Sequence, residues 1–282
     1  RIMLNVSIVL YHPDWQQVTS LTQTLLLSQH VHRIYWIDNS PAPATSLPME
    51  SKRVEYQHNN GRNVGYGAAH NIAIRESIYD DVLYHLVINP DVLLSVEALE
   101  SMLTFVSQHP EVGCLMPKVT YPDGTLQYLC KLLPTPVDVF TRRLLPKRWF
   151  SKRNARYEMH SSGYDHIMNV PYLSGCFMLF RTKALQEVRL FDERFFMYPE
   201  DIDITRRIHR NYLTVYFPHA TIIHNHEKAS YKSLKMFGIH AINMCRYFNK
   251  WGWFCDKERD HFNQIAVQEY LSPSEDSVQS AH

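Results

Sequence analysis

Short apolar runs alternate with helical stretches through the first part of the chain. The runs are rich in β-branched and aromatic residues and lie at residues 6–11, 34–37, 54–56, 84–88 and 114–116. The stretches between them that favour helices are residues 18–28, 68–76 and 96–108. Strands that alternate with helices form parallel sheets with helices on both faces. We therefore expect an α/β fold with a doubly wound, mostly parallel sheet.

Polar residues follow three of these strands at the point where each strand ends. Asp38 follows the second, a Gly- and Asn-rich loop at 59–67 follows the third, and Asn89-Pro90-Asp91 follows the fourth. Open α/β sheets bind ligands beyond the carboxyl ends of their strands. Asn-Pro and Pro-Asp are also ordinary turn dipeptides. Because three polar clusters fall at one edge of the sheet, we favour a binding site over unrelated turns.

The glycines of the 59–67 loop have the spacing of a dinucleotide-binding fingerprint at Gly65-x-Gly67. We reject that motif because the glycines do not follow the first strand and the third motif position is His70. The loop can still wrap a nucleotide with backbone N–H groups and with amide side chains such as Asn63.

A basic segment follows a predicted hairpin turn at residues 121–125. Between residues 131 and 156 eight cations accompany one carboxylate, Asp138, so the local charge is eight minus one, or +7. The cations are Lys131, Arg142, Arg143, Lys147, Arg148, Lys152, Arg153 and Arg156, with Leu144, Leu145, Trp149 and Phe150 among them. Two interpretations stay open: a solvated loop, or a surface that meets anionic lipid headgroups or a pyrophosphate-bearing acceptor.

An acidic cluster begins a predicted helix after Pro199. Glu200, Asp201 and Asp203 suit the first turn of a helix, where the helix dipole favours negative charge. Three aromatic residues and a methionine come just before them, at residues 195–198. Such surroundings indicate the other interpretation, in which the carboxylates are held in a walled site with tuned basicity.

Two histidines, His224 and His226, end a predicted strand and are separated by one residue. On a strand they point to the same face, a spacing that can present one or both imidazoles to a metal. Most such pairs without a third ligand are not metal sites. Residues 231–253 then predict a helix, either in the core or at a membrane surface, where its aromatic and basic residues would lie at headgroup depth.

Charge and apolar content exclude several classes of protein. Lys plus Arg number 29 against 28 Asp plus Glu, a net charge of +1 that argues against a nucleic-acid binder. Five cysteines without a Cys-x-x-Cys pair favour free thiols in a reducing compartment. The N-terminus does not look like a signal peptide, and no apolar run approaches the roughly 20 residues of a membrane span. We expect a cytoplasmic protein, or one held peripherally on the inner face of the plasma membrane.

Five motifs in this order and spacing carry a family resemblance. They are Ile37-Asp38-Asn39-Ser40; Asn63-Val64-Gly65-Tyr66 with Asn71; Asn89-Pro90-Asp91; Ser174-Gly175-Cys176-Phe177-Met178-Leu179; and Glu200-Asp201-Ile202-Asp203 followed by the histidines. From residue 6 to about residue 253 the chain resembles the family 2 inverting glycosyltransferases of the GT-A fold. It is most similar to bacterial rhamnosyltransferase-like enzymes of surface polysaccharide (O-antigen) assembly. The resemblance implies a GT-A-like α/β fold with a C-terminal helical extension.

The resemblance also implies roles for the donor-side residues. Asp38 would bind the nucleotide base, and Asn63, Gly65 and Asn71 would lie near the nucleoside. Asn89-Pro90-Asp91 stands where the family usually has Asp-x-Asp, which binds Mg²⁺ or Mn²⁺ on the diphosphate. Asn89 replaces the first Asp and remains in the donor site. Asp91 would bind the cation, with His224 or His226 as its partner ligand.

The implied reaction is transfer of a sugar, such as rhamnose, from a nucleotide-diphosphate donor with inversion. Asp201 would be the general base, with Glu200 as the second catalytic carboxylate. The acceptor would be a glycan or a polyprenyl-linked saccharide, with an anionic membrane surface as a further partner. The alternative is a non-catalytic nucleotide- or glycan-binding module derived from a glycosyltransferase.

This interpretation divides the chain into four parts. Residues 1–118 would bind the nucleotide sugar, and residues 119–230 would form the acceptor-binding and catalytic half of the same domain. Residues 231–271 would form a helical segment suited to a membrane surface, and residues 272–282 a disordered tail.

Overall fold

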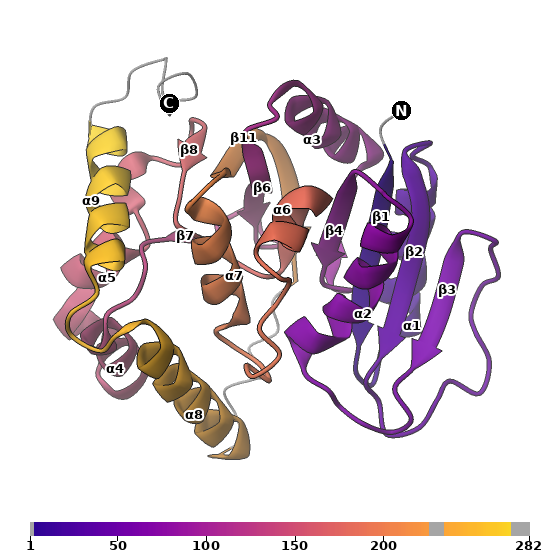
Figure 1. The fold of residues 1–282 in the computed structure, drawn as a ribbon, viewed down its shortest axis with the longest axis horizontal. Helices are drawn as coiled ribbons and strands as arrows, with labels where there is room; N and C mark the ends of the chain where they lie inside the picture. The colour runs from indigo at the N-terminus through magenta and orange to yellow at the C-terminus, as the bar shows by residue number, and fades with distance from the viewer. Residues whose placement is uncertain (1–2, 226–233, 272–282) are drawn as a thin grey trace.

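The computed structural model describes residues 3–225 and 234–271 (Figure 1). His226 and the expected tail at 272–282 therefore lie outside the described residues. The first half contains β1 (Leu4–Leu10), α1 (Trp15–Leu26), β2 (Val31–Asp38), β3 (Val54–His58), α2 (Tyr66–Tyr79), β4 (Tyr84–Ile88), β5 (Val92–Leu93), α3 (Val96–Gln108) and β6 (Val112–Thr120). The second half contains β7 (Cys130–Lys131), α4 (Pro136–Leu144), α5 (Ser151–Tyr157), β8 (Met168–Asn169), β9 (Tyr172–Leu173), β10 (Phe177–Arg181), α6 (Thr182–Glu187), α7 (Glu200–His209), β11 (Leu213–His224), α8 (Leu234–Trp251) and α9 (Lys257–Leu271).

The central sheet confirms the expected α/β class. Its strand order is β3-β2-β1-β4-β10-β6-β11-β5, with β8 paired to β11. The four strands β3, β2, β1 and β4 are parallel, as the alternation predicts. In the second half the sheet is mixed, because β10 runs antiparallel to both β4 and β6 while β11 runs parallel to β6. All five residues of β4 are buried, as expected of a strand covered on both faces.

Helix boundaries in the first half follow capping chemistry. Ser95 caps α3, since its Oγ accepts a hydrogen bond of 3.1 Å from the backbone N–H of Ala98. Asp14 caps α1 in the same way, through the backbone N–H of Gln16 at 2.9 Å. These caps fix where each helix begins, and so they fix the loops that leave the strand ends.

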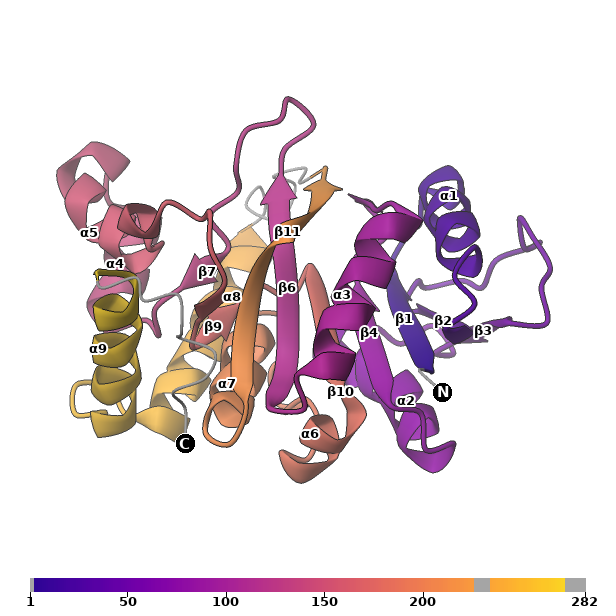
Figure 2. The same ribbon diagram turned by 90° about the horizontal axis from the view of Figure 1, so that it is seen from above.

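A smaller layer lies against the second half of the sheet. β7 and β9 form a two-stranded antiparallel sheet, and α4, α5 and α9 lie at the end of the molecule opposite β1–β3 (Figures 1 and 2). The expected C-terminal extension consists of two helices, with α8 packed beside α7. None of the helices within 3–225 and 234–271 has the length and apolarity that crossing a membrane requires.

Candidate active site

Asp38 ends β2 with its side chain buried and both carboxylate oxygens engaged. Oδ2 accepts a hydrogen bond of 2.6 Å from the Tyr56 hydroxyl, and Oδ1 accepts one of 2.8 Å from the backbone N–H of Ser40. The next residue, Asn39, donates through Nδ2 to the carbonyl of Gly65 at 3.2 Å. The end of β2 is thereby joined to the Gly- and Asn-rich loop.

Gly65 is the tightest point of that loop. Its φ of +94° lies in the region that favours glycine, and a Cβ at this position would lie 2.4 Å from the carbonyl oxygen of Phe196. The exposed Asn63 side chain accepts from the Gly65 N–H at 3.0 Å, and the Tyr66 N–H donates to the Phe196 carbonyl at 2.9 Å. The start of α2 therefore packs directly on the segment that precedes α7.

Asn71 is engaged by the protein itself. Its Nδ2 donates to the Phe191 carbonyl and to Glu193 Oε1, each at 2.9 Å, and its Oδ1 accepts from the Phe191 N–H at 3.0 Å. The side chain is buried and holds the 191–193 segment against α2. The predicted contact of Asn71 with a nucleoside stays a prediction.

The Asn89 turn meets α2 and the Gly175 segment through one tyrosine. The Tyr66 hydroxyl lies between Asn89 Oδ1, at 2.7 Å, and the Gly175 carbonyl, at 2.6 Å. The backbone N–H of Asn89 donates to the Cys176 carbonyl at 2.9 Å. Burial raises the pKa of Tyr66 well above its ordinary value, so this hydroxyl stays protonated. Sequence reasoning quoted Tyr66 within a motif but did not name it as a site residue.

Asp91 and His224 meet although they are far apart in sequence. Asp91 Oδ1 lies 3.2 Å from His224 Nε2, and the backbone N–H of Asn225 donates to the Asp91 carbonyl at 3.1 Å. Burial opposes a charged imidazole, but hydrogen bonds to Asp91 and Cys176 raise the pKa of His224 to about 10. The two predicted ligands thus form an ion pair, whereas His226 lies outside the described residues.

Asp91 and His224 together offer few atoms that could bind a metal ion. Within 3–225 and 234–271 no three His, Cys, Asp or Glu side chains converge as a metal site. Asp91 and His224 offer one carboxylate oxygen and one imidazole nitrogen, both of which bind divalent ions. These two residues would fit a divalent ion whose remaining ligands would come from a bound diphosphate and water.

Asp201 lies in the first turn of α7 with its carboxylate buried and oriented. Oδ2 accepts hydrogen bonds from the Gly175 N–H at 3.0 Å and from the Tyr172 hydroxyl at 3.3 Å, while Oδ1 accepts from the Ile202 N–H at 2.8 Å. Burial raises the pKa of Asp201, and these hydrogen bonds oppose that effect. The Gly175 segment therefore links Asp201 to Tyr66 and, through it, to Asn89.

Glu200 differs from its neighbour Asp201. It is buried, its Oε2 has no hydrogen-bond partner among the described residues, and burial together with the Asp201 charge raises its pKa to about 8. Both effects favour the protonated form of Glu200. The two acids at the start of α7 are thus not equivalent, and Asp201 is the one that is oriented as an acceptor.

Asp203 faces away from this cluster. It is fully buried and accepts from Lys250 Nζ at 2.7 Å, Trp251 Nε1 at 2.8 Å and Arg207 Nε at 2.8 Å. This carboxylate holds α7 to α8, so the interpretation of the acidic cluster as a single site applies to Glu200 and Asp201 only.

Lys131 is a neighbour of Asp201 that sequence reasoning counted only within the basic segment. Its Nζ lies 5.5 Å from the centre of the Tyr172 ring, and Tyr172 contacts Asp201. Burial lowers the pKa of Lys131, and the nearby Arg142 lowers it further. No local signal separates Lys131 from the other cations, because only the pairing of β7 with β9 brings it here.

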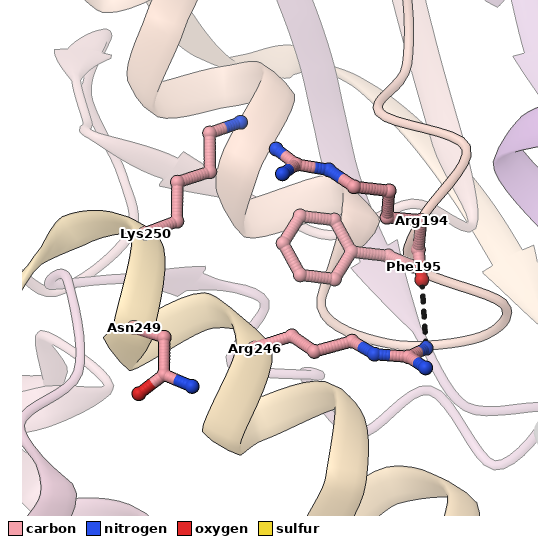
Figure 3. Close-up of a pocket in the computed structure, with 5 residues that line it drawn as sticks. All are labelled: Arg194, Phe195, Arg246, Asn249 and Lys250. Carbon is pink, nitrogen blue, oxygen red and sulfur yellow. Dashed lines mark hydrogen bonds between the residues drawn. The ribbon is translucent and has the colours of Figure 1, made fainter.

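A separate pocket of about 460 Å³ opens between α8 and the segment before α7 (Figure 3). It is lined by Arg194, Phe195, Arg246, Asn249 and Lys250. Arg194 and Lys250 both bind Asp192, and Arg246 donates to the Arg194 carbonyl at 3.0 Å. The lining therefore carries three cations and no carboxylate, and Asp192 beside it pairs with two of the three. None of the predicted site residues lines this pocket.

Comparison with solved structures defines the class of the fold. A structure of GalNAc-T7 with UDP, GalNAc and Mn²⁺ aligns over 95% of this chain and 52% of that chain, with a TM-score of 0.63 and 14% identity. The mannosyltransferase PcManGT from Pyrobaculum calidifontis, in complex with GDP-Man and Mn²⁺, aligns over 96% of this chain and 70% of that chain, with a TM-score of 0.59 and 13% identity. The fold is that of the GT-A glycosyltransferases.

The chain belongs to the family described as glycosyltransferase like family 2, whose sequence model matches residues 52–246. A curated relative is the N-acetylglucosaminyl-diphospho-decaprenol L-rhamnosyltransferase of Mycobacterium tuberculosis, which is 31% identical over 182 residues. That match covers 58% of this chain and 57% of the relative, so the chain spans little more than half the length of the relative it matches.

Proposed function

We propose that this chain is an inverting glycosyltransferase that moves a sugar from a nucleotide-diphosphate donor to a saccharide hydroxyl. The observation that carries the proposal is the buried Asp201 carboxylate, oriented by the Gly175 N–H and joined through Tyr66 to Asn89. Membership of glycosyltransferase like family 2 supports the reaction class. The name of the curated relative supports rhamnose as the sugar and a polyprenyl-linked saccharide as the acceptor.

We assign the donor to residues 1–118 and the acceptor to residues 119–230 of one domain. Asp38, the Asn63–Gly65 loop and Asn89 line the donor side, where contacts join them from β2 to the Asn89 turn. Asn71 acts on this side by holding the 191–193 segment. Residues 231–271 supply the helices that support α7.

Asp91 and His224 would hold a Mg²⁺ or Mn²⁺ ion together with the donor diphosphate. Such an ion neutralises charge on the nucleoside diphosphate leaving group. The ion pair between the two residues supports this assignment, because a divalent charge can displace the imidazole proton and take its place beside Asp91. The Mn²⁺ in both solved structures described above supports it further.

Asp201 is the general base in this mechanism. An acceptor hydroxyl attacks the anomeric carbon from the face opposite the diphosphate and gives its proton to Asp201 as the bond from the anomeric carbon to the phosphate oxygen breaks. One displacement inverts the configuration, so no covalent nucleophile is needed, unlike in retaining glycosidases. Burial and the neighbouring Asp201 charge favour the protonated form of Glu200, which leaves Asp201 as the proton acceptor.

The decisive variant is Asp201→Asn, which keeps the shape of the side chain and removes the base. We expect transfer to fall about 10²- to 10⁴-fold. Donor binding should persist, measured as the rise in melting temperature that a nucleotide sugar causes in a donor panel. Asp123→Asn, in the exposed turn after β6, is the matched control and should transfer normally.

Three outcomes would revise the proposal. Full transfer by Asp201→Asn would remove Asp201 from the role of base. Donor binding without turnover by the unaltered protein would indicate the non-catalytic nucleotide- or glycan-binding module instead. An equal donor-induced shift in Mn²⁺ and in EDTA would argue against the metal at Asp91.

We further propose that the basic segment at 131–156 meets an anionic membrane surface from the cytoplasmic side. Five of its cations, Lys147, Arg148, Lys152, Arg153 and Arg156, are exposed on and around α5. Attraction to anionic headgroups through such residues weakens as salt increases. Salt-sensitive flotation with anionic vesicles tests this part of the proposal.

A further inference from the structure

Exposed apolar side chains gather on two segments that are distant in sequence, one around α4 and one around α8. Of sixteen large hydrophobic side chains exposed in the described part of the chain, nine come from residues 136–150 and 234–254. They are Val137, Phe140, Leu144, Trp149, Leu234, Phe237, Ile242, Trp253 and Phe254. Such a concentration is unusual for a surface that faces only water and indicates a binding surface.

Part of this surface is a groove between α4 and α8. Phe140 and Leu144 line it from α4, and Phe237, Ala241 and Phe248 line it from α8, with Trp253 beyond the end of α8. Phe140 and Leu144 are four residues apart, and the α8 residues also follow helical spacing, so each helix presents one apolar stripe.

One charged side chain, Arg143, lines the groove and connects it to the site. Its guanidinium carbon lies 5.3 Å from the centre of the Tyr198 ring, and its Nη2 lies 3.2 Å from His240 Nδ1. Tyr198 is two residues before Glu200. The charged part of the groove therefore borders the segment that leads into the acids of α7.

Two further cations extend this positive region toward Asp201. Arg142 lies over the Tyr157 ring at 4.8 Å and pairs with Glu158 at 3.0 Å, so Glu158 balances part of its charge. Lys131 lies over the Tyr172 ring at 5.5 Å. Tyr172 donates to Asp201. An apolar groove, a group of cations and a buried carboxylate thus follow one another along this face of the second half.

We propose that the groove between α4 and α8 binds the apolar chain of a polyprenyl-linked acceptor, with Lys131, Arg142 and Arg143 supplying positive charge to its diphosphate. This inference rests on the proposed function. Such an acceptor consists of a polyprenyl chain, a diphosphate and a saccharide, in that order. The groove, the cations and Asp201 follow one another in the same order. Arginine suits phosphate because its planar group donates two parallel hydrogen bonds.

The polyprenyl chain of the acceptor is a better occupant of the groove than a flat bilayer or a second copy of this protein. The groove is concave and almost wholly apolar, with its arginine on the side toward the site, whereas the exposed cations that suit lipid headgroups lie around α5. An isoprenoid chain gains free energy from apolar burial along such a groove. Its diphosphate then comes to lie beside Arg143.

Phe237→Ser tests the groove with two acceptors that share a saccharide diphosphate but carry either a decaprenyl chain or a methyl group. We expect kcat/KM for the decaprenyl acceptor to fall about ten- to a hundredfold, the cost of losing burial of one aromatic side chain. The methyl acceptor should react equally with both proteins. Ile242→Ser is the matched control, since Ile242 is exposed on α8 but does not line the groove.

Arg143→Gln tests the charged end of the groove. We expect kcat/KM to fall about tenfold or more for both acceptors, because each carries the diphosphate. Arg143→Lys should restore part of the loss for both. The melting-temperature shift caused by the donor should not change in either variant.

Direct binding separates this inference from the proposed function. Decaprenyl diphosphate in detergent should quench the fluorescence of Trp253 at the groove, inorganic pyrophosphate should not, and Trp253→Phe identifies the signal. Chain-dependent quenching without any sugar transfer would support the groove and refute the proposed function. Equal loss of both acceptors in Phe237→Ser would overturn the groove. So would a loss confined to anionic vesicle binding, or to self-association measured by light scattering.

Discussion

Gly65 and Gly124 both have positive φ but differ in their surroundings. A Cβ at Gly65 would lie 2.4 Å from Phe196 O, whereas a Cβ at Gly124 would meet nothing within 4 Å. Gly124→Ala should cost about 1–2 kcal/mol from backbone conformation alone. Gly65→Ala should cost a further 1–3 kcal/mol or so, because the contact forces the backbone apart.

Urea unfolding of the two alanine variants measures this difference, provided that the m-value stays constant. Equal free energies of unfolding for both variants would mean that the 196 segment moves aside freely. Gly65 would then not fix the distance between α2 and the segment before α7.

Glu200 should make stability depend on pH in an unusual direction. Its carboxyl loses its proton near its ordinary pKa of 4.5 in the unfolded chain, but near pH 8 in the folded chain. Between these values the unfolded state binds fewer protons, so the free energy of unfolding falls as the pH rises. Glu200→Gln removes this contribution. The melting temperature of the unaltered protein should therefore decline relative to Glu200→Gln between about pH 5 and 8.

A constant difference in melting temperature between these two proteins across that range would show that Glu200 titrates normally. The comparison with Glu200→Gln matters because other acids also titrate, and the contribution of those that do not interact with Glu200 is common to both proteins. The remaining dependence is then assigned to Glu200 together with Asp201, whose titration is coupled to it.

At the scale of residues, the sequence predicted which polar residues lie at the ends of the strands. It did not predict the side chains that contact them. Asp38, Asn89 and Asp91 follow strands, so their common edge can be predicted from local pattern. Tyr66 could have been named, because it follows Gly65 directly in a quoted motif. Lys131 could not, since its place beside Tyr172 depends on a pairing between strands some 40 residues apart.

At the scale of elements, helix α7 makes important contacts through two of its faces. Asp201 lies on one, and on the other Arg206 is almost fully buried and binds Asp256 through two hydrogen bonds of 2.6 and 2.7 Å. Arg206 also binds Glu258 at 2.7 Å and lies 4.1 Å from the Trp251 ring. These contacts, with Lys250 on Asp203, hold α7 to the helices α8 and α9 (Figure 1).

Arg206→Ala should therefore destabilise the protein by about 3–5 kcal/mol, because it leaves Asp256 buried without its partner. Arg210→Ala is the matched control: Arg210 binds the same Glu258 but is half exposed, so its removal should cost about 1 kcal/mol or less. Chemical unfolding measures both values. Similar losses for both variants would indicate that α8 and α9 do not stabilise α7 through this buried pair.

The prediction of helices and strands succeeded where the local sequence pattern determines the element. It failed where pairing with distant strands determines the element's direction or length. The apolar residues of β10 favour a strand, but its antiparallel insertion between β4 and β6 follows from packing across the whole sheet. Residues 215–217 and 220–223 are two apolar runs that Pro218 separates in the sequence. They form one strand, β11, because the sheet accommodates Pro218 at a register shift opposite β6.

At the scale of the molecule, the two halves differ in how much the sequence reveals. The first half consists of strand and helix units that are adjacent in sequence, so alternation alone predicts its layers. The second half brings together β7 with β9, α4 with α8, and α7 with α9. Each of these pairs depends on side chains far apart in the chain. The sequence therefore predicted the proposed acceptor side as a range of residues, but it did not predict the contacts that form it.

The buried pair between Arg206 and Asp256 has a consequence for engineering. The stretch shared with the wider family ends at residue 246, yet the helix that carries Asp201 is held by Lys250, Trp251 and Asp256. A chimera that joins relatives at that border would contain Asp201, the proposed base, without the native residues that hold its helix in place. A chimera designed to exchange acceptor specificity between such enzymes should therefore take α7, α8 and α9 together from the same protein.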